Sequence, residues 1–252
     1  MDASPEESGD PPPYAFRTRD GRDEVLPPVI LVLDGTVIRA QSAGTRPLFE
    51  LSRDIIDGSS GVTTPILLKR LIYKVRTTRN GTPREAQRGQ PLFQLQHLGR
   101  VLSKGYPWCL EATSRSSVGN LALKTVALHR SRLKVVRTAS VEGHGLPKGY
   151  VARRKSLKDA ELVFDIVEKE NRYEWSNGEG ERVAVEDCFD GRCRLLVLAP
   201  LTRQTMDALV GSWCLRLWRA TEESTKGEAT SLVKFAVPLN VRKAREILPR
   251  YW

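Results

Sequence analysis

One long apolar segment near the C-terminal end, residues 202–220, most constrains what this chain can fold into. Its apolar side chains recur every three or four residues, which is the spacing of one helix face. That stripe consists of Met206, Leu209, Val210, Trp213, Cys214 and Leu217. Ala208, Leu215 and Trp218 widen it to most sides, so we expect a helix enclosed by the rest of the fold, with Thr202 as its N-cap. A helix lying on a membrane or against a partner protein is the alternative interpretation.

The chain before this helix is a series of short apolar or alternating runs separated by turn residues. Asp34-Gly35, Asn80-Gly81 and Asn177-Gly178 are tight-turn signals. Strands are expected at residues 29–33, 36–40, 48–51, 66–76, 92–96, 108–112, 120–128, 133–136, 161–167, 172–175, 182–186 and 194–199. About a dozen strands without an intervening long helix predict a mainly β fold, either a barrel or a sandwich.

Composition divides the chain into three parts. Residues 1–27 are rich in proline and charge and poor in large apolar groups, which predicts a disordered leader. Residues 28–220 hold the β domain and its helix, and residues 221–252 form a C-terminal extension. Within that extension we expect a strand at 231–237 and a short basic helix at 241–248.

The balance of charge and the absence of targeting signals bear on location and partners. The formal net charge of +10 favours acidic partners: lipid headgroups, nucleic acid phosphates or an acidic protein surface. The first residues have no apolar core like that of a signal peptide, and no segment is apolar enough to cross a bilayer. We therefore expect a cytoplasmic protein whose four cysteines are free thiols.

No motif in the sequence predicts catalysis or a cofactor. Residues 29–36 resemble the signature of haloacid-dehalogenase phosphatases, but Val32 stands where that family has its nucleophilic aspartate, and a hairpin turn explains the same residues. Cys188 and Cys193 lack both the second pair that a zinc site needs and the spacing of redox motifs. Glu186-Asp187 could serve as acid and base, although charged hairpins explain them equally well. We expect a protein that is not an enzyme and that needs neither metal nor cofactor.

Basic residues are concentrated in two segments. Residues 69–104 hold nine basic residues and one acid, Glu85, whereas residues 159–190 are strongly acidic. Residues 124–158 hold a single acid, Glu142, and ten basic residues that we predict to bind an anion: Lys124, Arg130, Arg132, Lys134, Arg137, Lys148, Arg153, Arg154, Lys155 and Lys158. Such segregation predicts one markedly positive face, with an ordinary solvated surface as the alternative.

The order of these elements resembles that of the tubby-like superfamily, which includes tubby C-terminal domains, plant LURP-one-related proteins and phospholipid scramblases. The resemblance rests on the run of strands, on the last strand at 194–199 and on the apolar helix from Met206 to Trp218. Arg172-Tyr-Glu-Trp175 followed by Arg182-Val-Ala-Val-Glu186 also resembles a hairpin of filamentous-fungal proteins of this type. The resemblance implies a closed barrel of about twelve strands around a buried C-terminal hydrophobic helix. The C-terminal signature of true tubby proteins is absent, so none of their ligand-binding residues transfers.

These observations predict a non-enzymatic intracellular binding module. Its partner is expected to be an anionic membrane lipid or an acidic protein surface, and a lipid partner would place the protein peripherally at membranes. Nucleic acid is less favoured, because few aromatic residues are interleaved with the basic ones. A protein-interaction or scaffold subunit without a small ligand is the alternative, and an enzyme with an unrecognised site is the third interpretation.

Overall fold

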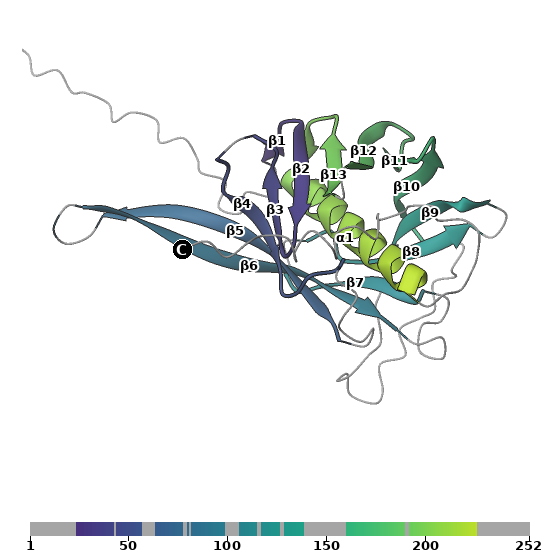
Figure 1. Ribbon diagram of the computed structural model, residues 1–252, viewed down its shortest axis with the longest axis horizontal. Coiled ribbons are helices and arrows are strands. Elements are labelled where there is room, and N and C mark those ends of the chain that lie inside the picture. Colours follow the sequence, from purple (N-terminus) through teal and green to yellow (C-terminus); the bar gives the residue numbers. More distant parts are fainter. Residues whose placement is uncertain are drawn as a thin grey trace, which may run out of the picture.

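Twelve antiparallel strands close into a barrel around one helix in the computed structural model of the protein (Figure 1). The structure describes residues 24–42, 44–56, 64–77, 80, 82–98, 106–114, 117–126, 129–138, 160–189 and 192–225. Each barrel strand pairs with the next strand along the chain, and β13 pairs with β2 to close the ring. The barrel expected from the sequence is therefore confirmed, and the sandwich alternative is wrong.

The barrel strands and their bounds follow the chain order. They are β2 (Val29–Asp34), β3 (Val37–Ala40), β4 (Pro47–Leu51), β5 (Ile66–Thr77), β6 (Pro83–His97), β7 (Trp108–Ala112), β8 (Asn120–Val126), β9 (His129–Thr138), β10 (Leu162–Lys169), β11 (Arg172–Asn177), β12 (Arg182–Phe189) and β13 (Arg192–Val197). Alternation along each strand sends one set of side chains inward. In β13, for example, Cys193, Leu195 and Val197 are buried, and the residues between them are more exposed.

The helix α1 (Arg203–Thr225) lies inside this ring. Every residue from 206 to 218 is buried, and a helix that is buried on all sides has to be enclosed. Its apolar side chains join those of the strands in one core cluster, in which Trp108 of β7 meets Trp218 of α1 edge-to-face at 5.1 Å. Among the described residues, no helix combines the length and apolar character needed to cross a membrane.

Thr202 caps the helix as predicted, because its side-chain oxygen accepts a hydrogen bond of 3.2 Å from the backbone N–H of Thr205. The helix extends five residues beyond the predicted end at residue 220. The C-terminal extension was therefore placed too early. Its expected strand at 231–237 and helix at 241–248 lie outside the described residues.

Two further boundaries differ from expectation. The leader predicted for residues 1–27 ends too late, since β1 (Val25–Leu26) pairs with β14 (Leu201–Thr202) beside the start of α1; residues 1–23 lie outside the described part. The turn between β2 and β3 also falls one residue later than predicted. Its two residues are Gly35 and Thr36, and Gly35 has a φ of 59°, which glycine adopts without strain.

Candidate anion-binding surface

The ten predicted anion-binding residues are placed unevenly. Lys148, Arg153, Arg154, Lys155 and Lys158 lie outside the described residues, and Arg130 is described only as a backbone position in β9. Lys124 lies on β8, and Arg132, Lys134 and Arg137 lie on β9. The structure therefore describes the side chains of these four members of the predicted site.

Lys124 and Lys134 lie side by side on the outer wall of the barrel. They face each other across β8 and β9, and residues directly opposite in an antiparallel pair project to the same side of a sheet. Their neighbours Leu123 and Val135 form the adjacent pair and are buried in the core, so the two lysines point outward. Neither lysine forms an ion pair with a described residue, which leaves two adjacent positive charges.

The other two members of the predicted site, Arg132 and Arg137, form ion pairs with acids. The guanidinium of Arg132 donates to both carboxylate oxygens of Asp165 on β10, with an Nε–Oδ1 distance of 2.9 Å, and these hydrogen bonds raise the pKa of Arg132. Arg137 Nη1 lies 3.0 Å from Glu161 Oε2. The acidic segment after residue 159 thus supplies β10, directly beside the basic strand β9. Among the described members of the predicted site, Arg132 and Arg137 are therefore paired with acids, whereas Lys124 and Lys134 are not.

The other basic segment, residues 69–104, forms a different structure. β4 pairs with β5 as far as Arg70, and β7 pairs with β6 from Phe93 onward. Beyond these points the two strands pair, among the described residues, only with each other, as a ribbon that projects from the barrel (Figure 1). We call residues 71–77 and 83–89 the β5–β6 arm.

One face of this arm is basic without an acid. The register pairs Arg88 with Ile72, Lys74 with Ala86 and Arg84 with Arg76, which places Lys74, Arg84 and Arg88 on the same face. All three residues are exposed, and none forms an ion pair with a described residue. We call these three residues the basic arm face. Its cations have no counter-ion from the described chain.

The opposite face of the arm accommodates the segment's one acid. Glu85 forms an ion pair with Arg46, whose guanidinium carbon also lies 5.4 Å from the centre of the Tyr73 ring. The Tyr73 hydroxyl donates a 2.9 Å hydrogen bond to the backbone carbonyl of Pro47. The acid and the aromatic ring of the arm are therefore both on the face away from its free cations.

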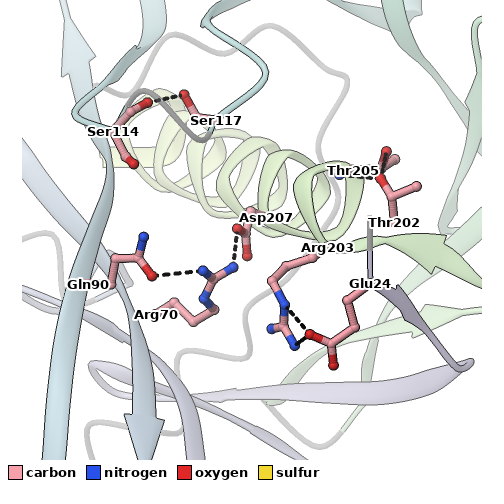
Figure 2. A network of polar contacts seen from close by, with 9 residues as sticks. All are labelled: Glu24, Arg70, Gln90, Ser114, Ser117, Thr202, Arg203, Thr205 and Asp207. Atoms are coloured by element: carbon pink, nitrogen blue, oxygen red, sulfur yellow. Dashed lines mark hydrogen bonds and ion pairs between the residues drawn. The ribbon is translucent and has the colours of Figure 1, made fainter. Parts of the chain in front are cut away.

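The base of the arm is fixed to the start of the helix. Arg70, on the same face as Lys74, donates from Nη1 to Asp207 Oδ2 at 2.6 Å and from Nη2 to Gln90 Oε1 at 2.8 Å (Figure 2). Burial raises the pKa of Asp207 to about 6, although the Arg70 charge opposes that shift. Close by, Arg203 forms an ion pair with Glu24, so two salt bridges bind the first turn of α1 to its surroundings.

The other candidate for chemistry, Glu186-Asp187, is divided between the two sides of β12. Glu186 is buried and forms an ion pair with Arg216 of α1, whose guanidinium carbon lies 4.2 Å from the centre of the Tyr173 ring on β11. Burial raises the pKa of Glu186, and Arg216 opposes this effect. Asp187 pairs with Arg194 at 2.8 Å. Each carboxylate already holds a guanidinium, which is the arrangement of a structural ion pair.

The sequence predicted no metal site, and it did not identify the basic arm face. No cluster of three or more metal-ligating side chains occurs among the residues that the structure describes. The net charge of the segment does not reveal the basic arm face, whereas the even spacing of Arg84 and Arg88 on one strand indicates that they share a face. The described parts of the two basic segments, the arm and the β8–β9 wall, lie on opposite sides of the view (Figure 1).

Comparison with known proteins returned no match of any kind. No family model, no curated protein and no solved structure matches the chain. The chain is therefore characterised by its own geometry: a closed β-barrel with an enclosed helix and a projecting basic arm.

Proposed function

We propose that this chain is a non-enzymatic binding module that engages an anionic partner through the basic arm face. The observation that carries the proposal is the grouping of Lys74, Arg84 and Arg88 on one exposed face without a counter-ion among the described residues. Unpaired cations that share a face create a local positive potential, which attracts anions and speeds their association. The Lys124–Lys134 pair on the barrel wall is a second, smaller positive area.

The proposed partner is a membrane surface that carries anionic phospholipid headgroups. Arg84 and Arg88 are four residues apart on one strand, which separates them by about 13 Å, so they would reach different headgroups. A ribbon that projects from a barrel can also lie along a planar surface without displacing the core. The barrel with its enclosed helix agrees with the architecture implied by the tubby-like resemblance, and we propose membership of that superfamily as further support for a lipid ligand.

Single-stranded nucleic acid fits the arm less well. Proteins that bind it combine cations with aromatic side chains on which bases stack. The aromatic residue of the arm, Tyr73, lies on the opposite face and is engaged by Arg46 and Pro47. The basic arm face therefore offers charge without a stacking platform.

Vesicle co-sedimentation of the full chain tests the proposal. We expect binding to phosphatidylcholine vesicles that contain phosphatidylserine or a phosphoinositide, little binding to pure phosphatidylcholine, and weaker binding as salt rises. Each basic residue near an anionic membrane contributes about 1 kcal/mol, so the triple variant Lys74→Gln/Arg84→Gln/Arg88→Gln should lose about 100-fold in affinity. The matched control Lys124→Gln/Lys134→Gln removes positive charge from the barrel wall and should lose much less.

Three outcomes would overturn this proposal. Failure of the wild-type chain to bind anionic vesicles would remove the lipid partner. Equal losses in both variants would mean that overall charge, and not the arm, governs binding. Tighter binding to a DNA duplex than to anionic vesicles at the same salt concentration would assign the arm to nucleic acid instead.

A further inference from the structure

Two cysteines lie directly opposite each other where β12 and β13 approach their connection. Cys188 is the second-last residue of β12, and Cys193 is the second residue of β13. The strand register pairs them, and their Sγ atoms are 2.8 Å apart. The sequence alone suggested two free thiols without a redox motif, because the usual spacing of two intervening residues is absent.

The backbone at this position suits a disulfide. The N–H of Leu198 donates to the carbonyl of Val183, which marks these opposed residues as a hydrogen-bonded pair. Hydrogen-bonded and non-hydrogen-bonded pairs alternate along an antiparallel ladder, so Cys188 and Cys193, five positions further, form a non-hydrogen-bonded pair. Such pairs have Cα atoms about 4.5 Å apart, which lies within the range that disulfides span.

The two thiols differ in their surroundings. Cys188 is exposed, and Cys193 is buried behind it. The two sulfurs share a hydrogen bond in which either can be the donor, and this contact lowers the pKa of Cys188 and raises that of Cys193. Because the thiolate is the nucleophile in thiol chemistry, Cys188 is positioned to react first and Cys193 to react second.

The remaining cysteines provide a contrast within the same protein. Cys109 and Cys214 are both buried, and neither forms a pair with another described sulfur. Burial raises the pKa of Cys109 to about 12 and also raises that of Cys214. Both therefore stay protonated and covered, as structural thiols do.

We propose that Cys188 and Cys193 form a reversible disulfide across β12 and β13 by exchange with a low-molecular-weight disulfide. The Cys188 thiolate attacks one sulfur of that disulfide, so its S–S bond breaks, a mixed disulfide forms on Cys188, and one small thiolate leaves. Cys193 then gives its proton to water and attacks the Cys188 sulfur, which releases the second small thiol. The protein loses two electrons and two protons in total, and the small disulfide gains both. This modification is independent of the basic arm face.

Peptide mapping of the full-length protein tests this proposal. The protein is equilibrated with mixtures of reduced and oxidised glutathione, quenched with acid, alkylated and digested with trypsin without reduction. Trypsin cleaves after Arg182, Arg192 and Arg194, so an intramolecular bond would link the peptide of residues 183–192 to the dipeptide of residues 193–194. We expect this linked pair to increase with the oxidised fraction, to disappear on reduction, and to lower the intact mass by two hydrogen atoms.

Controls separate the proposed bond from general oxidation. Cys109 and Cys214 should remain unmodified in the folded protein and should become alkylated only after denaturation. Cys193→Ser should stop the reaction at a stable glutathione adduct on Cys188, and Cys188→Ser should give neither adduct nor bond. The proposal is wrong if the wild-type protein yields no linked peptide pair at any ratio, if it stops at the adduct, or if the linked peptides contain Cys109 or Cys214.

Discussion

Within residues 206–218 of α1, two charged residues interrupt the apolar sequence, and each forms an ion pair with a residue of the barrel wall. Asp207 pairs with Arg70 of β5 near the start of the helix, and Arg216 pairs with Glu186 of β12 in its second half. A helix that is buried on all sides could rotate or slide among equivalent apolar contacts. Leaving a buried charge unpaired costs several kcal/mol, so any placement of the helix that breaks either ion pair is strongly disfavoured. The two pairs therefore define the register of the helix inside the barrel.

Replacing one member of the Glu186–Arg216 pair should be strongly destabilising. Glu186→Gln leaves Arg216 buried without a counter-ion, and we expect the free energy of unfolding to fall by about 3–5 kcal/mol. The matched control is the next residue, Asp187→Asn, whose partner Arg194 is 27% exposed and can be solvated. That control should cost about 1 kcal/mol or less. Urea denaturation of both variants measures the difference, and equal losses would contradict the assigned role of the Glu186–Arg216 pair.

Asp207 should make stability depend on pH. Its pKa in the folded protein is raised from the ordinary 3.8 to about 6, so between these values the folded state holds a proton that the unfolded chain has released. The resulting stabilisation is fully present below about pH 4 and is lost as pH rises through about 6, with a total of about 3 kcal/mol.

The measurement compares wild type with Asp207→Asn by urea denaturation at several pH values from 4 to 7. The unfolding free energy of the wild type should fall relative to that of the variant as pH rises through this window. Parallel curves would show that the Arg70 ion pair keeps the carboxylate at its ordinary pKa. A relative rise of the wild type would show that the ion pair outweighs burial.

At the scale of elements, α1 approaches the barrel wall closely at Gly211. A Cβ atom at this position would lie 3.1 Å from Phe93 Cδ2 on β6 and 3.2 Å from Leu110 Cδ1 on β7, both closer than an ordinary contact. Phe93 and Leu110 are fully buried, so neither side chain can turn away into solvent. A methyl group at this position would therefore require the Phe93 and Leu110 side chains to shift by a few tenths of an ångström.

Gly211→Ala is therefore expected to reverse the usual effect of this substitution. Helix propensity alone predicts a gain of about 1 kcal/mol. Overpacking of a closed core costs about 1–3 kcal/mol, and we expect that cost to exceed the gain and to lower the melting temperature. Ala220→Gly, near the end of the same helix and only partly buried, serves as the propensity control, since it changes the same two residue types without crowding the core. A higher melting temperature for Gly211→Ala would contradict the close approach.

Strand and helix patterns explain which elements the sequence could predict. The barrel strands bury alternate side chains, and α1 buries a whole apolar segment, so each leaves a recognisable pattern in the sequence. The first half of β6 does not follow it: residues 83–90 are mostly polar, and they form a strand because they pair with β5 along the arm. The two-residue strands β1 and β14 are too short to leave any pattern.

The candidate site was less predictable, because charge counting does not identify neighbours. The sequence located the basic segments correctly, but it could not place Asp165 beside Arg132, since these residues are brought together by pairing of β9 with β10. Likewise, Glu85 looked like a neutralising residue within the second basic segment. Strand register places it on the face opposite Lys74, where it pairs with Arg46.

At the scale of the whole molecule, the barrel and its helix have to form together. The first and last barrel strands meet, because Val29 and Val32 of β2 are paired with Val197 and Arg194 of β13, and the ring is then complete. The helix follows β13 directly through β14, yet its side chains are buried against strands from all around the ring. Opening the ring would expose the helix, and removing the helix would leave the ring without its core.

Unfolding is therefore expected to be a single cooperative transition. Four of the five tryptophans are buried, Trp108 and Trp175 on strands and Trp213 and Trp218 on the helix. Tryptophan fluorescence therefore reports mainly on the interior, while far-UV circular dichroism reports on the backbone. The two signals should give coincident urea curves.

Trp213→Ala should lower the unfolding free energy by about 3–5 kcal/mol and shift both curves together, because a large buried ring is lost from the centre of the core. A fluorescence transition that precedes the loss of β structure would mean that the helix can leave an intact barrel. An unchanged midpoint in Trp213→Ala would mean that the helix is not enclosed at all.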